Sequence, residues 1–357
     1  MNAITITCEK KSGIARMNYL TSYHLCIISA AFVLLGAPEV NAQTDTADGT
    51  SLLESCLLES MKTATPDTTV GEIRAQCQTI FPEPAAASTE DIVETAMTPA
   101  QIRLLEDQVS YNRHFSISAF QPNYFIGTYS TDPNGEPFAD FPPGEAGLEN
   151  EEAKFQVSIK APLWRTMFGS NNDLIAAYTS TSWWQVTGDS SAFRETNYQP
   201  ELFLRHYGGW DFLGGQFVAA DLGFNHQSNG RGGTLSRSWN RIMGRLYLDY
   251  DSIAVGLRAW YRIPESGDSD DNPGMHRYYG YGDVLVAYAP NKNTFTAMLR
   301  PGTQEGGVEL TWSYPLTNTF RAYAQYWNGY GESLIDYDAR IERIGIGIAL
   351  NDWLERR

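Results

Sequence analysis

Three residues near the middle of the chain have the types and spacing that acyl-ester hydrolysis requires. His226 and Ser228 lie two positions apart, and Asn240 follows in the next polar run. Side chains two apart on a strand share one face, so an extended segment places the imidazole beside the hydroxyl. If the chain folds back as a hairpin about Gly232-Gly233, Asn240 comes opposite His226. The three side chains could then act as nucleophile, general base and orienting group.

The pattern alone is weak evidence for catalysis. A His-x-Ser sequence is common by chance, and a histidine beside a glycine-rich turn is most often a surface polar residue. Whether these residues form an active site or only a polar surface therefore depends on the fold that would position them.

The composition favours a β-barrel. The chain has 357 residues, of which 42% are hydrophobic and 13% aromatic, and it contains 31 glycines. Aromatic and glycine enrichment without long apolar runs is typical of barrels with aromatic girdles. The formal net charge of −16 argues against nucleic acid as a partner, because phosphate binding needs a basic patch.

The N-terminus predicts export. The apolar run from Leu25 to Ala37 is too short to span a bilayer as a helix but has the length of a signal-peptide core. Basic residues precede it, and Val40-Asn41-Ala42 follows as a small-residue cleavage site. We therefore expect residues 1–42 to be a signal peptide.

Residues 43–112 are expected to form an N-terminal extension, placed in the periplasm. Two short amphipathic segments around Cys56 and Cys77 predict a helical hairpin, and two cysteines in an oxidising compartment most simply form one disulfide. Residues 80–112, with their prolines, alanines and scattered acids, are expected to be a linker.

The rest of the chain, residues 113–357, predicts a transmembrane barrel domain. Segments of about ten residues, alternating or apolar, lie between Gly, Pro, Asn and Asp clusters, which is the pattern of membrane-spanning strands. Twelve such segments are expected, at 115–128, 153–163, 173–186, 195–206, 211–227, 236–250, 253–264, 278–289, 293–300, 306–315, 318–328 and 340–352.

The segment 344–350 alternates most clearly, with Ile and Leu side chains on one face and Gly or Ala on the other. A soluble β-sandwich or lipocalin-like barrel would alternate in the same way, but the expected signal peptide and the aromatic residues favour a membrane barrel. These aromatic residues gather near strand ends, as interfacial girdles do. These are Trp183, Trp184, Tyr198, Trp260, Tyr261, Tyr278, Tyr279, Trp327 and Tyr330.

Several runs of the chain resemble one family, the outer membrane phospholipase A of Gram-negative bacteria. The runs 225–231 and 235–241 are similar to its active-site signature, and Phe193 to Tyr198, Asp270 to Pro273 and Gly331 to Tyr337 are similar to its other characteristic runs. The resemblance covers about residues 115–354. It implies a twelve-stranded outer-membrane barrel that hydrolyses acyl esters of phospholipids and lysophospholipids.

The resemblance also implies residue roles, a cofactor and a partner. Ser228 is then the nucleophile, His226 the general base and Asn240 the residue that orients it. Calcium is implied as cofactor and a homodimer as the active form. The calcium ligands implied are the backbone carbonyl of Arg231, the side chain of Ser236 and a carbonyl of Ser190 from the second subunit.

The chain departs from the family at a few positions. Asp271 matches one carboxylate of a second calcium position known in the family, but Gly233 stands where the other would be. Ser180 stands where the family commonly has a glutamine at the dimer interface.

The leading hypothesis places the active site on the outer wall of the barrel. Phe224, His226 and Ser228 share the face toward the membrane, and Asn225, Gln227 and Asn229 then face the polar interior. Two rival functions remain open at this stage: a passive pore or structural barrel without activity, and a barrel hydrolase acting on lipopolysaccharide acyl chains.

Overall fold

The computed structural model describes residues 98–111, 116–139, 148–169, 171–188, 192–267 and 270–354. The expected signal peptide and the pair Cys56 and Cys77 lie outside the described residues. The described elements are α5 (Pro99–Ser110), β1 (Ser118–Ala119), β2 (Tyr124–Ser130), η1 (Glu136–Phe138), β3 (Glu151–Trp164), β4 (Asn172–Trp184), β5 (Phe193–Tyr207), β6 (Asp211–Phe212), β7 (Gly215–Ser228), η2 (Gly233–Leu235), β8 (Ser238–Tyr250), β9 (Ile253–Arg262), α6 (His276–Tyr279), β10 (Gly282–Tyr288), β11 (Thr294–Arg300), β12 (Gly307–Pro315), β13 (Arg321–Tyr330) and β14 (Arg340–Ala349).

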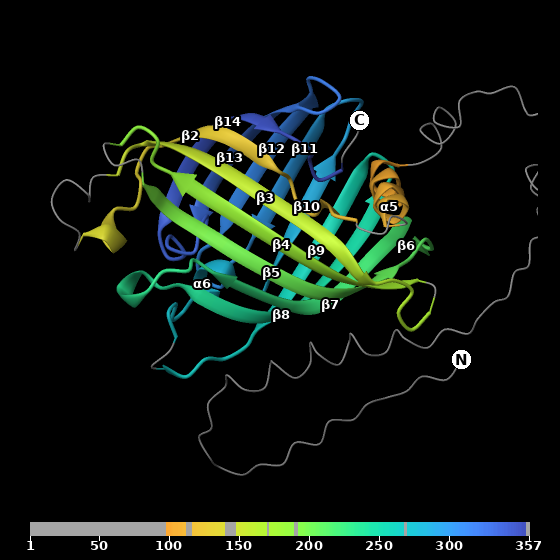
Figure 1. Ribbon diagram of the computed structural model, residues 1–357, viewed down its shortest axis with the longest axis horizontal. Helices are drawn as coiled ribbons and strands as arrows, with labels where there is room; N and C mark the ends of the chain where they lie inside the picture. The colour runs from red at the N-terminus through yellow and green to blue at the C-terminus, as the bar shows by residue number, and fades with distance from the viewer. Residues whose placement is uncertain are drawn as a thin grey trace, which may run out of the picture. The chain divides into compact units, whose positions relative to one another are not determined.

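One antiparallel sheet closes on itself into a barrel (Figure 1). Two of its fourteen strands in the described residues, β1 and β6, are two-residue extensions that pair with β3 and β7. The other twelve form the wall, and β14 closes it by pairing with β2, with Ile346 opposite Gly127. Closure removes the free strand edge that a bilayer could not satisfy. The prediction of a twelve-stranded antiparallel barrel is confirmed.

The predicted strand ranges all overlap the observed wall strands, with the largest difference at the first. The predicted range 115–128 begins before β2, which starts at Tyr124. Pro122 has no N–H to donate to a ladder. The side chain of Asn123 accepts from the backbone N–H of Ser158 at 2.7 Å and donates to Asn351 Oδ1 at 2.7 Å. On the side toward β3, a side-chain amide therefore takes the place of a backbone ladder bond just before β2.

Strand β14 separates an apolar outer face from a crowded inner face, as its alternation predicts. Ile344 and Ile346 are 61% and 70% exposed on the outer face. A β-carbon at Gly347 would collide with the carbonyl oxygen of Phe125 on β2. Glycine therefore permits the close approach of β14 and β2 that closes the barrel, while the outer isoleucines present a surface suited to lipid.

Part of the predicted aromatic girdle is wrong. Trp183, Trp260, Tyr279 and Trp327 are buried, with 7% or less of their surface exposed. Trp260 and Tyr279 belong to a core cluster under the long loops, whereas the neighbouring Tyr261 is 59% exposed. Adjacent residues of a strand point to opposite faces, so only one of Trp260 and Tyr261 can face the membrane interface. Tyr279 lies in α6 rather than in a strand.

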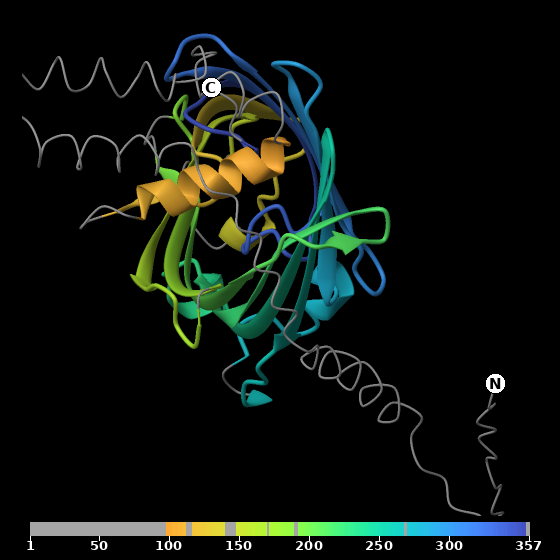
Figure 2. The ribbon, with the colours of Figure 1, turned by 90° about the vertical axis from the view of Figure 1, so that its right-hand side faces the viewer.

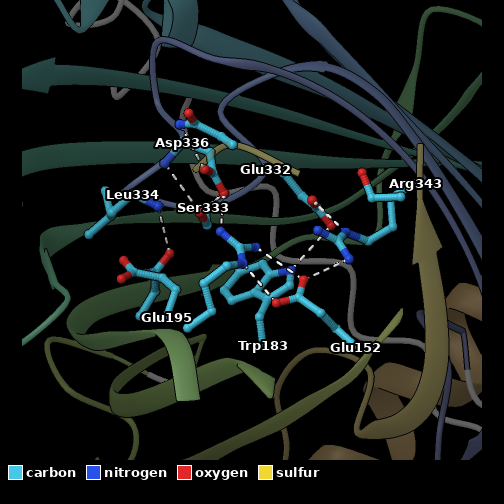
Figure 3. A network of polar contacts seen from close by, with 12 residues as sticks. Glu152, Trp183, Glu195, Glu332, Ser333, Leu334, Asp336 and Arg343 are labelled. Carbon is cyan, nitrogen blue, oxygen red and sulfur yellow. Dashed lines mark hydrogen bonds and ion pairs between the residues drawn. The ribbon is translucent and has the colours of Figure 1, made fainter. Parts of the chain in front are cut away.

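Charged side chains are buried inside the barrel beside the loop that joins β13 and β14, and Figure 3 shows their contacts. Arg194 of β5 binds Glu152 of β3 at 2.7 Å and Asp336 of the segment 331–339 at 2.7 Å. Arg343 of β14 binds Glu152 at 2.7 Å and Glu332 at 2.9 Å. We call these five residues the inner network. It joins the runs 193–198 and 331–337, two of the runs on which the family resemblance rests.

Helix α5 corrects the expectation of a linker over residues 80–112. It lies across the opposite end of the barrel, where the short turns are (Figures 1 and 2). Thr98 and Gln101 form a reciprocal capping box, in which each backbone N–H binds the other side chain, at 3.1 and 3.3 Å. Asp107 makes a buried ion pair with Lys160 of β3. None of the helices in the described residues is long and apolar enough to cross a bilayer.

Candidate active site

The hairpin of β7 and β8 brings the predicted residues together. In its register His226 lies opposite Asn240, and Ser228 lies opposite Ser238. Gly230 and Gly233 in the connecting loop adopt φ values of 65° and 64°, which glycine accommodates without strain. The hairpin about Gly232-Gly233 expected from the sequence therefore forms.

Asn229 holds the hairpin loop in shape from within. Its Nδ2 donates to the carbonyl of Leu235 at 2.8 Å. Its Oδ1 accepts from the backbone N–H groups of Arg231 at 3.2 Å and Arg237 at 3.0 Å. Its Nδ2 also lies 3.4 Å from Glu195 Oε2, so the loop is connected to the charged barrel interior.

The imidazole of His226 is bonded to the carboxamide of Asn240. The two atoms, Nδ1 and Oδ1, are 2.9 Å apart. Because a carbonyl oxygen only accepts, Nδ1 carries the proton in this arrangement. Nε2 is then left with a free lone pair, as a general base requires.

The His226 and Ser228 side chains lie on the outer face of the barrel wall. Both are partly exposed, and Phe224, two residues before His226, is 42% exposed. Asn225 on the inner face is completely buried, and its Oδ1 accepts from Arg241 at 2.6 Å. The alternation predicted from the sequence therefore holds, and the imidazole and hydroxyl face the region that lipid occupies.

Side-chain oxygen atoms of two serines and one aspartate lie close together beside this hairpin, at the start of β8. The hydroxyl of Ser236 donates to Asp271 Oδ2 at 2.7 Å, and the hydroxyl of Ser238 lies 3.2 Å from the same oxygen. Asn272 fastens this loop to β8, because its amide accepts from the N–H of Ser238 and donates to the carbonyl of Ser238. The structure thus brings Ser236, a ligand implied for the first calcium position, into contact with Asp271, the carboxylate that matches the second position.

The other predicted ligands are placed differently. The guanidinium of Arg231 donates to the carbonyls of Phe193 at 3.0 Å and Arg194 at 2.7 Å, which fixes the loop that carries the Arg231 carbonyl. Ser190 lies outside the described residues. No group of three or more His, Cys, Asp or Glu side chains suited to a metal occurs among the described residues. A donor set of hydroxyl, carbonyl and single carboxylate oxygens nevertheless suits calcium, which binds oxygen and keeps waters in its coordination sphere.

One contact of the site was not foreseen from the sequence. The Nδ2 of Asn240 donates to Glu265 Oε1 at 3.3 Å. Glu265 follows β9, and β9 pairs with β8 such that Arg262 lies opposite Arg241. Counting back from the tight turn at Asp251-Ser252 would have placed residues 263–265 beside Asn240.

The fold and the site together define a class of protein. A closed barrel with an apolar outer wall spans a membrane, and this one carries a serine, a histidine and an asparagine on that wall. This is a transmembrane β-barrel of hydrolase type.

Comparison with known proteins narrows the class to one family. A family model described as Phospholipase A1 matches residues 101–350. The Phospholipase A1 of Escherichia coli strain K12 is 40% identical over 246 residues, which are 68% of this chain and 84% of that protein. The Phospholipase A1 of Salmonella typhimurium is 38% identical over 283 residues, which are 77% of this chain and 96% of that protein. The chain belongs to the phospholipase A1 family.

Solved structures agree with this assignment. The outer membrane phospholipase A from Escherichia coli superposes with a TM-score of 0.64 at 39% identity, covering 67% of this chain and all of that one. The Salmonella typhi outer membrane phospholipase, solved as a dimer with bound calcium, gives 0.65 at 37% identity, covering 71% of this chain and 98% of that one. The predictions of an outer-membrane location and of a phospholipase enzyme are confirmed.

Proposed function

We propose that this enzyme hydrolyses the acyl esters of phospholipids and lysophospholipids at both glycerol positions, with Ser228, His226 and Asn240 as its catalytic residues. The observation that carries the proposal is the 2.9 Å bond between His226 and Asn240 on the lipid-facing wall, with Ser228 beside them on the same face. A lipid ester in the outer leaflet would meet these side chains without leaving the membrane.

The chemistry follows from the three side chains. Ser228 Oγ attacks the carbonyl carbon of the ester while His226 Nε2 accepts the hydroxyl proton. The imidazolium then gives that proton to the leaving glycerol oxygen, and the acyl group stays on Ser228. A water molecule then attacks the acyl carbon and loses a proton to His226. The imidazolium returns this proton to Ser228 Oγ as the bond between Oγ and the acyl carbon breaks and the fatty acid leaves. Asn240 keeps the ring in the orientation and tautomer that both steps need.

Calcium is proposed to bind at the start of β8. The Arg231 carbonyl and the Ser236 hydroxyl would hold the ion, and Asp271 would supply a carboxylate from the loop beside it. A bound calcium would supply positive charge for the oxyanion that forms on the ester oxygen. The 2.7 Å contact between Ser236 and Asp271 supports this placement, because it brings a hydroxyl and a carboxylate oxygen to one point.

Homodimerisation is proposed to complete the site. The carbonyl of Ser190 from a second subunit would join the calcium ligands, so one chain alone would hold an incomplete site. Two observations support a dimer: the Salmonella typhi relative is a dimer with bound calcium, and the outer wall around the site carries the exposed Leu202, Leu222 and Phe224.

The alternative of a passive pore is disfavoured by the filled interior. The inner network and the buried segment 331–337 occupy the interior at the long-loop end, and α5 lies across the other end. The polar cavity between them has a volume of about 140 Å³. A barrel with this interior is a poor conduit, whereas its outer wall carries chemically competent groups.

The proposal is tested by hydrolysis of a long-chain phospholipid in detergent, with calcium and with chelator. We expect calcium-dependent release of fatty acid, near-complete loss in Ser228→Ala and His226→Ala, and strong loss in Ser236→Asn. Ser252→Ala, in the turn between β8 and β9 at the far end, is the matched control and should retain activity. Full activity in chelator would contradict the role of calcium, and full activity of Ser228→Ala would contradict the mechanism.

Crosslinking with and without calcium tests the dimer. We expect calcium to increase the crosslinked dimer in detergent. A purely monomeric enzyme that remains fully active would contradict the shared site.

A further inference from the structure

We propose that Glu265 is a positioning residue that fixes the carboxamide of Asn240 for its contact with His226. This inference rests on the proposed function of the site and extends it by one residue. It starts from the hydrogen bond that Asn240 Nδ2 donates to Glu265 Oε1 at 3.3 Å, on the side of the amide away from the imidazole.

The need for such a residue follows from the chemistry of an amide. The two ends of a carboxamide have nearly the same shape, so Asn240 could present either oxygen or nitrogen to the ring. Only the oxygen accepts a proton from Nδ1 and leaves Nε2 free as a base. If the nitrogen faced the ring, Nδ1 would have to accept, and Nε2 would carry the proton. A base in that tautomer could not take the proton of Ser228.

Glu265 removes this ambiguity because an ionised carboxylate can only accept. It binds the NH2 end of Asn240 and so turns the oxygen toward His226. The carboxylate also places a negative charge behind a neutral orienting residue. In a Ser-His-Asp triad the third residue itself carries that charge and stabilises the imidazolium. In this site the negative charge belongs to Glu265, and Asn240 lies between that charge and the imidazole of His226.

The fold holds Glu265 at this place. Ile263, the residue after β9, donates its N–H to the carbonyl of Asn240 at 2.8 Å, and Pro264 restricts the backbone that follows. The guanidinium of Arg262 lies 3.7 Å from Glu265 Oε2, an oxygen that is buried and has no hydrogen-bond partner among the described residues.

Arg262 also connects Glu265 to the proposed calcium loop. It donates to Asp270 Oδ1 at 2.5 Å and to the carbonyl of Asn272 at 3.1 Å. The side chain of Glu265 is 17% exposed, so water screens its contact with Asn240 only in part. The same arginine therefore steadies both the residue behind Asn240 and the residues on either side of Asp271.

The test is a double-mutant cycle measured as kcat and KM for phospholipid hydrolysis. Glu265→Ala should lower kcat roughly tenfold with little change in KM, the effect of losing one hydrogen bond to a charged acceptor. Glu265→Gln should stay within roughly threefold of the native rate, because its side-chain oxygen can still accept from Asn240. In an Asn240→Ala background, Glu265→Ala should have no further effect. Glu305→Ala, an exposed carboxylate of another loop at the same end, is the matched control.

The outcomes separate this inference from the proposed function. Native kcat in Glu265→Ala, or an equal loss with and without Asn240, would overturn the positioning role while leaving the enzyme's function intact. An unmutated enzyme that fails to cleave phospholipid would overturn both. Heat-dependent gel migration reports whether each barrel is folded. If Glu265→Ala does not fold, Glu265→Met, which keeps the side-chain volume, replaces it in the same double-mutant cycle.

Discussion

The inner network and the outer active site lie at the same end of the barrel, on opposite sides of one wall. Arg194 and Arg343 are buried and bound to carboxylates on both sides. His226 and Ser228 are partly exposed, and His226 is held through one ring nitrogen by Asn240. The buried charges fasten strands and loops together, whereas the outer residues stay accessible to a substrate. Stability and chemistry should therefore be separable by mutation.

The largest effect is expected from breaking the inner network at Arg194. Arg194→Met leaves the carboxylates of Glu152 and Asp336 buried with one partner fewer. Removing one member of a buried ion pair costs about 3–5 kcal/mol. The free energy of unfolding in detergent micelles should fall by that amount, whereas Arg340→Met, at an exposed position on β14, should change it little. A loss below about 1 kcal/mol in Arg194→Met would contradict the structural role of the network.

The pH dependence of stability should report the same network through Glu332. Burial alone would raise its pKa, but Arg343 and Lys154 outweigh burial and lower the pKa to about 2. The unfolded pKa is about 4.3. The folded value is the lower one, so the stabilisation is present above pH ~4.3 and is lost as the pH falls toward 2.

Unfolding measured across this range should lose on the order of 3 kcal/mol from this one group. Glu332→Gln removes the titrating carboxylate, so its free energy of unfolding should fall less steeply as the pH is lowered. At neutral pH this variant should be less stable than the native chain. An unchanged slope in the variant would assign the acid sensitivity to other groups.

On the outer side, Asn240→Ala should lower activity and spare stability. Its hydrogen bond to the imidazolium of the transition state contributes about 1.5–3 kcal/mol, so kcat should fall about 10- to 150-fold. The unfolding free energy should stay close to that of the native chain. If this variant lost stability as well as activity, mutation could not separate the chemistry of the active site from the stability of the barrel.

The smallest effect is expected at α5. Thr98→Ala removes one half of the capping box and the hydroxyl contact with Asp249 of β8, and should cost about 1–2 kcal/mol of stability. Phospholipid hydrolysis should be unchanged, because α5 lies at the other end of the barrel from His226. Reduced kcat in Thr98→Ala would point to a connection between the two ends.

The sequence predicts those parts of this molecule that follow from local periodicity. The twelve wall strands and the outward placement of His226 and Ser228 depend on alternation and on one hairpin, so they could be foreseen. Helix α5 was missed because prolines and alanines suggested a linker, although the Thr98-Pro99-Ala100-Gln101 run holds a capping box. The position of an aromatic residue along a strand predicts a girdle, but the face on which its side chain lies decides whether it reaches the membrane interface.

Contacts between strands divide into two kinds. Glu265 reaches Asn240 through the pairing of β8 with β9, so counting from the turn between these two strands gives the contact. Arg194 reaches Asp336 only because the barrel closes, and no local pattern in either segment indicates that pairing. The roles of Cys56, Cys77 and Ser190 stay predictions.

The central claim is that Ser228 is a nucleophile activated by His226 on the lipid-facing wall. A long-chain alkyl fluorophosphonate, followed by peptide mass spectrometry, tests it directly. We expect one phosphonyl group on Ser228, formed quickly in the native enzyme, slowly in His226→Ala and not at all in Ser228→Ala. Modification of a different serine, or equal labelling in His226→Ala, would contradict the account.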